Sequence, residues 1–285
     1  MHPRIKITTI CENRVSSYGL AAEHGLSMLL EIGEQKILFD TGAGQTLLAN
    51  AEVLGVDFCL LNAVVLSHGH YDHTGGLKDV LEKNNSIPVY AHPDVFNCKY
   101  RIREGESPKY IGPPWTQEQL LEMRARLHLE KEPVDLGGGL LLTGQVPRLE
   151  ESEKQERYFF RKAGKNFVED TLNDDQALVV ESPLGLIVLL GCTHAGLINT
   201  LRHVTRLTGR EDIYALIGGT HLLNASVSRL AYTLRTLRGF KIEFIAPCHC
   251  TGPMATAVFQ QVFGERFLDN RAGSIFEFGT EAHEN

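Results

Sequence analysis

The chain has 285 residues, of which 43% are hydrophobic and 22% charged, so it has enough apolar material for the core of one large domain. Its formal net charge of -7 argues against a global positive field that would attract nucleic acid or an anionic membrane. No apolar run approaches the roughly 20 residues that cross a bilayer, and the first residues lack the layout of a signal peptide. Six cysteines without a framework spacing favour reduced thiols, and we expect a cytoplasmic protein.

The first half of the chain begins with segments that have the apolar patterns of β-strands. We expect these strands to span residues 4–10, 26–32, 36–40 and 63–67. Gly33-Glu34-Gln35 separates the second from the third and is typical of a hairpin loop. The fourth is a continuous apolar run, which favours a strand buried on both faces. Residues 75–83 follow with Leu77, Val80 and Leu81 at helical spacing, which predicts a helix.

Two polar stretches, residues 93–133 and 150–170, interrupt this order without a clear period. Long irregular insertions in compact domains are frequently lids or binding loops. We therefore expect a single domain over residues 1–285, with these two insertions as a lid. Within the first of them, Thr116 and Gln119 form a capping-box pattern that predicts a helix over residues 116–127.

The second half alternates buried strands with amphipathic helices. The strands are expected at residues 177–181, 185–191, 213–219 and 242–247, and the helices at residues 195–207, 226–237 and 256–263. Such an alternation is typical of an α/β protein.

The stretch "LSHGHYDHTGGL", residues 66–77, places His68, His70, Asp72 and His73 in the loop that leaves a buried strand. Imidazole and carboxylate are ligands of zinc at about 2.0 to 2.2 Å, so several of them must converge on one point. A backbone that reverses direction after a strand can turn alternate side chains inward together. His68 and His70 could hold one ion, and Asp72 with His73 a second.

Three more histidines follow later strands, at the sheet edge where α/β proteins place their sites. His194 and His249 are expected to complete the ligand sets of the two ions. His221 is expected as a ligand, as a general acid, or as a hydrogen-bonding partner of a ligand.

The early cluster resembles the His-x-His-x-Asp-His signature of the metallo-β-lactamase-fold hydrolases, and Asp40 in "ILFDTG" matches a residue common in them. The resemblance implies a four-layer αββα sandwich with a dinuclear metal site at one edge of its sheets. His70 stands where the related diiron oxygen reductases have Glu, which favours hydrolytic or transfer chemistry over redox chemistry.

Two features depart from that family pattern. The segment "LLLTGQVPR" holds no counterpart of the usual Pro-Gly-His-Thr histidine, and Cys192 in "GCTH" stands where most members carry a bridging Asp. Either Cys192 or His194 supplies what that aspartate supplies, or solvent alone bridges the ions.

The motifs "EHGLS", "DDQALVVE", "GCTHAGL", "GGTHL" and "PCHCTG" resemble one subgroup, the proteins similar to archaeal dihydropterin ribofuranosylaminobenzene phosphate synthases. The resemblance implies a dinuclear metal-dependent hydrolase or transferase acting on a phosphorylated or otherwise anionic small molecule. If the subgroup's activity carries over, the reaction is a condensation on a pterin-type diphosphate. Asp72 and His221 are the expected catalytic residues.

The expected cofactors are two divalent ions, with zinc favoured and manganese, iron or nickel also compatible with these donors. The alternative function is a non-catalytic metal-binding or sensor protein, in which a Cys192 thiolate closes the site. We expect a small anionic substrate as the partner, no nucleic acid and no membrane; a homo-oligomer stays open.

Several weaker signals surround this cluster. His24 is either a residue at the edge of the pocket or a structural histidine. Asp174-Asp175 either support the site or form an ordinary turn. The sequence Cys248-His249-Cys250 lacks the second cysteine pair that a zinc knuckle needs. Basic and aromatic residues of the first insertion either close over a flat anionic substrate or form a solvated loop: Lys99, Tyr100, Arg101, Arg103, Lys109, Tyr110 and Trp115.

Overall fold

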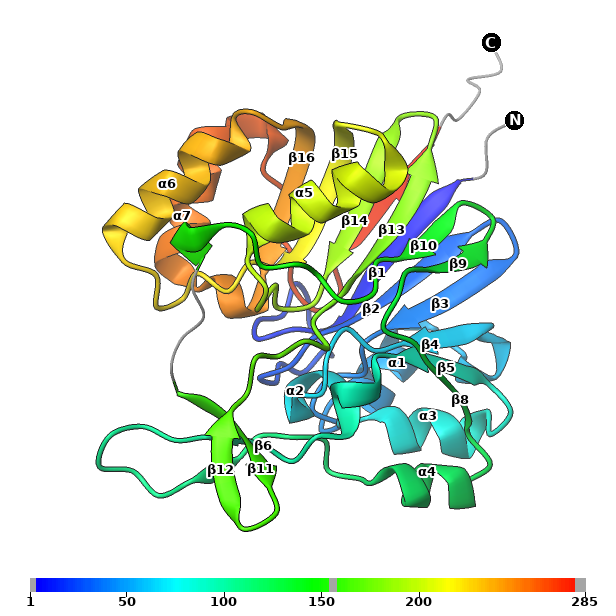
Figure 1. Ribbon diagram of the computed structural model, residues 1–285. Helices are drawn as coiled ribbons and strands as arrows, with labels where there is room; N and C mark the ends of the chain where they lie inside the picture. The colour runs from blue at the N-terminus through cyan, green and yellow to red at the C-terminus, as the bar shows by residue number, and fades with distance from the viewer. Residues whose placement is uncertain (1–3, 154–157, 280–285) are drawn as a thin grey trace.

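Two β-sheets pack face to face in a computed structural model that describes residues 4–153 and 158–279 (Figure 1). The first sheet has the strand order β17-β1-β2-β3-β4-β5-β8. Its strands are β1 (Ile5–Cys11), β2 (Ser27–Ile32), β3 (Gln35–Phe39), β4 (Ala63–Val65), β5 (Pro88–Ala91), β8 (Arg126–Leu129) and β17 (Ile275–Phe278). The strands from β3 to β8 run parallel, and the remainder pair antiparallel.

The second sheet has the order β16-β15-β14-β13-β10-β9. Its strands are β9 (Val134–Gly137), β10 (Leu140–Leu142), β13 (Ala177–Ser182), β14 (Gly185–Leu190), β15 (Asp212–Gly219) and β16 (Lys241–Cys248). Strands β14, β15 and β16 run parallel, so their carboxyl ends meet at one edge.

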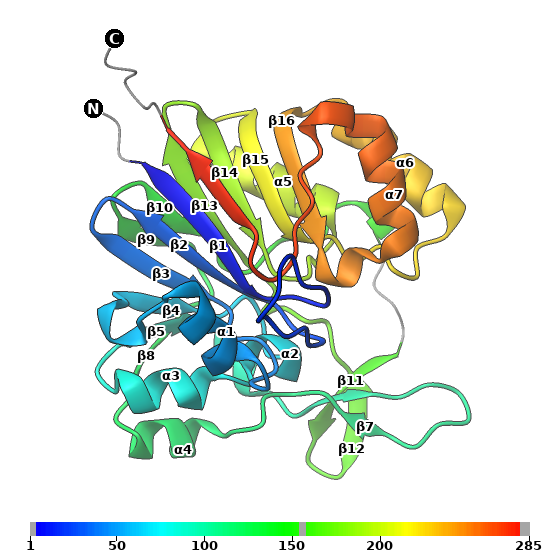
Figure 2. The same cartoon turned by 180° about the vertical axis from the view of Figure 1, so that it is seen from behind.

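Helices cover the outer face of each sheet, as the two views in Figures 1 and 2 show. Next to the first sheet lie α1 (Leu47–Leu54), α2 (Tyr71–Thr74), α3 (Leu77–Lys83) and α4 (Gln117–Glu122). Next to the second lie α5 (Leu197–Thr208), α6 (Val227–Leu237) and α7 (Pro253–Phe263). Single 3₁₀ turns are at Phe58–Leu60, Pro93–Phe96, Glu151–Glu153, His249–Thr251 and Gly264–Arg266.

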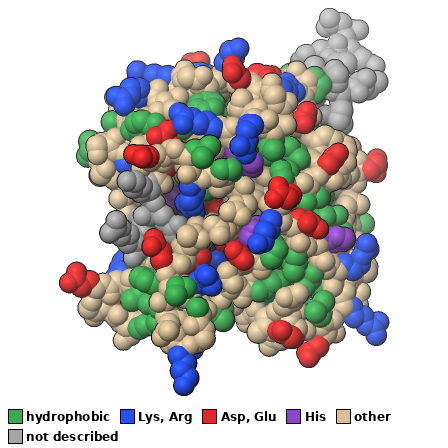
Figure 3. All heavy atoms as spheres, viewed as in Figure 1, with side chains coloured by type: hydrophobic (Ala, Val, Ile, Leu, Met, Phe, Trp, Pro, Cys, Tyr) green, Lys and Arg blue, Asp and Glu red, His purple; other side chains and the backbone are tan. Residues whose placement is uncertain are grey.

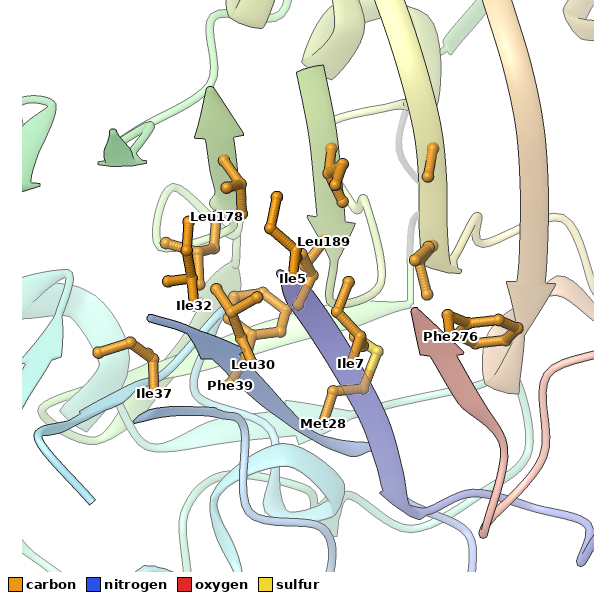
Figure 4. Packing of buried hydrophobic residues seen from close by; sticks show 14 of the residues in the cluster. Ile5, Ile7, Met28, Leu30, Ile32, Ile37, Phe39, Leu178, Leu189 and Phe276 are labelled. Atoms are coloured by element: carbon orange, nitrogen blue, oxygen red, sulfur yellow. The ribbon is translucent and has the colours of Figure 1, made fainter. Parts of the chain in front are cut away.

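The central core fills the space between the sheets (Figure 4). Ile7, Leu30 and Phe39 of the first sheet face Leu178 and Leu189 of the second, and all five are fully buried. Alternate residues of the same strands point outward and pack under the helices in two further clusters. Because the central strands of both sheets are buried on both faces, the order of layers is α, β, β, α, and the αββα sandwich expected from the sequence is confirmed.

A third, small sheet is formed by the two insertions together. Its order is β12-β11-β6-β7, with β6 (Lys99–Arg101) and β7 (Lys109–Tyr110) from the first insertion and β11 (Phe159–Ala163) and β12 (Asn166–Glu169) from the second. We call this sheet and its loops, residues 98–112 and 158–170, the arm. The arm projects from the body of the molecule in Figures 1 and 2. Residues 154–157 of the second insertion lie outside the described residues.

The helix expected over residues 116–127 is wrong in its extent. The capping box of Thr116 and Gln119 is present, but the helix ends at Glu122, and Arg124 has φ 65°. Residues 126–129 instead form β8, which extends the first sheet beside β5. Parallel pairing with β5 provides backbone partners that a local helical pattern cannot reveal.

The helix expected over residues 75–83 is present as α3, which begins at Leu77, and Gly75 and Gly76 separate it from the short helix α2 before it. A Cβ at Gly75 would lie 2.3 Å from the carbonyl oxygen of Ala43, and one at Gly76 would lie 2.4 Å from that of Thr41. Only glycine allows the loop after β4 to approach the loop after β3 so closely.

None of the helices in the described part of the chain is long and apolar enough to span a bilayer. On the face shown in Figure 3, acidic and basic side chains are interspersed, and neither sign gathers into an extended patch.

Candidate metal centre

The side chains singled out in the sequence lie where strands end. His68 and His70 follow β4, His194 follows β14, His221 follows β15, and His249 follows β16. Parallel strands bring their carboxyl ends to the same edge of a sheet, which is the physical reason why residues so distant in sequence meet there.

His68, His70 and His194 form one group of imidazoles. Their ring centroids lie 4.7 to 4.8 Å apart, and His68 Nε2 is 2.9 Å from His70 Nδ1. Among the residues that the structure describes, His70 Nε2 and both ring nitrogens of His194 are buried without a hydrogen-bond partner. Leaving buried polar nitrogens unpaired is costly, so this group has the donors that a cation would need.

Asp72, His73 and His249 form the second group. His73 Nε2 lies 3.2 Å from His249 Nε2, and Asp72 Oδ2 lies 3.4 Å from the same nitrogen. All three side chains are buried. Imidazole and carboxylate donors at this separation fit a second divalent ion.

Cys192 stands between the two groups. Its sulfur, with one donor atom each of His68 and His194, forms a set of atoms within 4.8 Å of one another, and it forms another such set with His73 and His249. Cys192 Sγ is 3.2 Å from His73 Nε2. The two groups therefore share this thiol, which occupies the central position.

Buried hydrogen bonds hold the second group in place. His73 Nδ1 lies 2.7 Å from Asp40 Oδ2, and the same carboxylate accepts bonds from Ser67 N and Ser67 Oγ. His249 N donates to Glu12 Oε1 at 2.7 Å, and His249 Nδ1 lies 2.9 Å from Asn13 Oδ1. Such partners set the tautomer and orientation of ligating imidazoles.

Glu12 and Asn13, which orient His249, were not expected from the sequence. The available signal was a polar "EN" pair directly after an apolar strand, and it was too weak to separate from an ordinary turn.

The family model that describes the metallo-β-lactamase superfamily matches residues 21–249 of the chain. The chain belongs to the metallo-β-lactamase superfamily. The family resemblance expected from the His-x-His-x-Asp-His motif is thereby confirmed.

Among the relatives, a 7,8-dihydropterin-6-methyl-4-(beta-D-ribofuranosyl)-aminobenzene-5'-phosphate synthase of Methanocaldococcus jannaschii is 29% identical over 284 residues, which is 96% of this chain and 97% of that protein. An uncharacterized protein of the same organism is 35% identical over 263 residues, covering 89% of this chain and 93% of its own. The crystal structure of Tm1679, described as a metal-dependent hydrolase of the β-lactamase superfamily, superposes with a TM-score of 0.83 at 29% identity and covers 97% of this chain and all of that one.

Burial and nearby charges set the protonation states of the histidine cluster in this member of the superfamily. Burial lowers the pKa of His68 and His194 well below the ordinary value and that of His70 to about 3. Burial alone would raise the pKa of Asp72, but His73, His24 and His249 hold it well below its usual range. Burial opposes a charge on His73 as well, but the charges of Asp40 and Asp72 raise its pKa to about 9, so this imidazole must lose a proton to take the neutral form that binds metal.

His221 lies beside the first group without belonging to it. Its ring centroid is 4.2 Å from that of His194, its backbone N–H donates to Cys250 Sγ, and its φ is 50°. Donor atoms of His221, Cys192 and Cys250 also lie within 4.8 Å of one another. His221 thus lies next to the candidate metal centre.

His24 borders the same space. Its side chain is 57% exposed, and its Nε2 lies 3.2 Å from Asp72 Oδ2. The hydrogen bond to Asp72 raises the pKa of His24. Of the two interpretations of His24, the one that places it at the pocket is confirmed.

A cavity of about 350 Å³ opens over both groups. Its floor includes His70, Asp72, Cys192, His194 and His249, and His221 is on its wall. The arm contributes three cationic side chains to the same cavity, namely Arg101, Arg103 and Lys109. Solvent access to one side of the ligand cluster is what a catalytic metal site requires.

Tyr100 and Tyr110 of the first insertion pack on each other and do not line this cavity, and neither do the buried residues Lys99 and Trp115. Lys99 is buried and its ammonium contacts Asp174 at 2.9 Å and Asp170 at 3.2 Å. Trp115 is buried and donates from Nε1 to the carbonyl oxygen of Thr74, the last residue of α2. For Lys99 and Trp115, the expectation of a contact with substrate is wrong, because ion pairs hold the ammonium of Lys99 and packing holds the ring of Trp115 away from the cavity.

The acidic pair Asp174-Asp175 supports the histidine loops. Asp174 Oδ2 accepts a 2.7 Å bond from Gly69 N, between His68 and His70. Asp175 Oδ2 accepts a 2.8 Å bond from Ala195 N, next to His194. The two carboxylates therefore support the site, and the segment that carries them is also a turn.

The three residues Cys248-His249-Cys250 do not converge on one ion. Cys248 lies in the core between the sheets, where its sulfur accepts a bond from Asn270 Nδ2. Cys250 points toward Cys192 and His221. The structure agrees with the sequence in disfavouring a zinc knuckle.

Proposed function

We propose that this protein is an enzyme that holds two divalent metal ions and acts on a phosphorylated or otherwise anionic small molecule. The observation that carries the proposal is the convergence of six candidate ligands around Cys192, beneath an open cavity that Cys192 and four of these ligands line. The arrangement of these donors supports a dinuclear centre in which Cys192 stands between the ions.

The donor set fits this cofactor. His68, His70 and His194 would hold one ion, Asp72, His73 and His249 the other, and the Cys192 thiolate would contact both. Imidazole, thiolate and carboxylate together favour zinc, although manganese, iron and nickel accept the same histidines and carboxylate. Bound divalent ions supply Lewis-acid polarisation of a phosphoryl or carbonyl oxygen and acidify water.

The chain's own residues orient the reaction. Asp72 stays ionised among His24, His73 and His249, so it fixes negative charge at the floor of the cavity. His221 lies on the wall next to His194, where its ring can move a proton to or from a leaving group. Phe159 packs on His70 and His194 and excludes water from that side.

Two reaction types are compatible with this site, and the relatives exemplify both. One relative is named as a metal-dependent hydrolase and the other as a phosphate synthase. We propose that the substrate carries phosphate or diphosphate, because Arg101, Arg103 and Lys109 line the cavity beside the candidate ligands. If the synthase activity is shared, diphosphate is the leaving group of a pterin-type substrate and an aromatic amine riboside phosphate replaces water.

The rival function is a metal-binding or sensor protein without turnover, favoured by the thiol of Cys192 in the central position. A metal-bound crystal structure separates the two functions. An ion with a coordination position open to solvent supports the enzyme, and ions whose positions are all filled by protein overturn it.

The test of the proposal is metal analysis of the purified protein, followed by assays with phosphodiester, lactone, thioester and β-lactam substrates. Replacing both His68 and Asp72 with Ala should abolish bound metal and turnover together. The matched control is His128→Ala, since His128 is an exposed histidine of β8 that lines none of the site. Full activity in the double variant would end the proposal.

A further inference from the structure

One face of the arm points at the metal centre. In the antiparallel pairing of the arm, Arg101 is opposite Phe159 on one side and Lys109 on the other. Directly opposed residues of antiparallel strands share a face of the sheet. Phe159 lies against the rings of His70 and His194, at 5.4 and 5.2 Å between centroids, so Arg101 and Lys109 are on the same, site-facing side.

The cationic side chains on this face use only part of their hydrogen-bonding capacity within the described protein. Arg101 is half-buried and makes a 3.1 Å contact with Glu106 Oε2, while its Nε is buried with no hydrogen-bond partner among the described residues. The guanidinium of Arg103 lies 5.0 Å above the ring of Tyr158. A guanidinium on an aromatic face is held in place while its N–H edges stay free to donate.

The arm is held in a defined position relative to the histidine loop. Lys99, two residues before Arg101 on β6, forms the buried contacts with Asp170 and Asp174. Asp174 in turn accepts the bond from Gly69 N. A second connection runs through the backbone, because Tyr71 N donates to the carbonyl oxygen of Ile111. The basic face is therefore preorganised over the cavity, which lowers the entropic cost of binding there.

We propose that Arg101, Arg103 and Lys109 form the binding site for a phosphate or diphosphate group of the substrate, while the reacting bond lies over the histidine cluster. The position of the reacting bond over the histidine cluster rests on the proposed function. Arginine forks bind phosphate oxygens in a bidentate manner, and lysine adds a point charge. The arm thereby selects phosphorylated molecules, and the metal centre carries out the reaction.

Inorganic pyrophosphate is the probe for this site. We would titrate it by isothermal calorimetry into metal-loaded wild-type protein and into the double variant Arg103→Gln/Lys109→Gln, with metal content measured before and after. The dissociation constant should rise about tenfold or more in the double variant, because each lost charge-assisted bond weakens binding severalfold. The metal content should be unchanged.

Lys162→Gln is the matched control. Lys162 is an exposed cation of the same sheet, three residues from Phe159 on β11 and hence on the opposite face, and it does not line the cavity. The Lys162→Gln variant should bind pyrophosphate with the affinity of the wild type. An unchanged affinity in the double variant, an equal loss in the control, or no binding by the wild type would each overturn the inference. Wild-type protein that takes up no metal would instead defeat the proposed function.

Discussion

His73 and Asp40 form a buried pair in which Nδ1 and Oδ2 lie 2.7 Å apart and neither side chain is exposed to solvent. Asp40 also accepts bonds from the backbone and side chain of Ser67, so its carboxylate acts only as an acceptor. His73 must then donate from Nδ1, which leaves Nε2 as the nitrogen that faces Cys192 and His249. The pair selects the tautomer that can bind an ion.

Asp40→Asn should therefore weaken metal binding by about 10- to 100-fold, since the amide cannot accept all three bonds. The backbone should tolerate the change, because Asp40 has φ 60° and Asn adopts this conformation readily. Chelator competition measures the affinity, with Asp57→Asn as an exposed acidic control. Wild-type affinity in Asp40→Asn would show that Asp40 does not orient His73.

Cys192 should give a spectroscopic signature. If its thiolate contacts the ions, cobalt-loaded protein should show a sulfur-to-cobalt charge-transfer band in the near ultraviolet, and Cys192→Ser should lose it. Cys192→Asp should lose the band but keep both ions, because it restores the carboxylate usual in the superfamily. The control is Cys59→Ser, an exposed thiol in the 3₁₀ turn before β4, at the end of that strand opposite to His68. A band that persists in Cys192→Ser would exclude Cys192 as a ligand.

Lys99→Met should lower the free energy of unfolding by about 3–5 kcal/mol, because it leaves Asp170 and Asp174 buried without their cation. Urea unfolding of the metal-free protein measures the loss. Lys162→Met removes an exposed lysine from the same sheet and should change stability by less than about 0.5 kcal/mol. A loss below about 1 kcal/mol in Lys99→Met would show that the ion pairs do not hold the arm.

Asp175 should make stability depend on pH. Burial raises the pKa of its carboxyl to about 6, although hydrogen bonds from backbone N–H groups and the charge of Arg148 oppose this. In the unfolded chain the pKa is about 3.9, so between about pH 4 and pH 6 the folded protein binds more protons, and its stability falls as the pH rises.

An asparagine side chain cannot titrate, so Asp175→Asn should remove this dependence. Because one pKa unit corresponds to about 1.4 kcal/mol, the stability of wild type relative to Asp175→Asn should fall by up to about 3 kcal/mol across that window. Urea unfolding of both metal-free proteins between about pH 4 and pH 7 measures the difference. A difference that stays constant with pH would contradict the raised pKa of Asp175.

The sequence by itself determined the superfamily, the strands β1 to β4 and β13 to β16, and the candidate ligand residues that the structure brings together. His68, His70, Asp72 and His73 lie in one short loop, and a loop after a buried strand is a local feature that spacing can reveal. The later histidines were found because parallel strands end at a common edge, which is a general property of such sheets.

Only the tertiary structure decided what lies between these residues. That Cys192 touches both groups depends on the relative position of β4, β14 and β16, and no pattern within one segment encodes it. Tertiary contacts also determine the pairing of β6 with β11, the burial of Lys99, and the formation of strand β8 where the local pattern is helical. Each depends on contacts between segments far apart in the chain, and burial and hydrogen bonding in those contacts outweigh local preference.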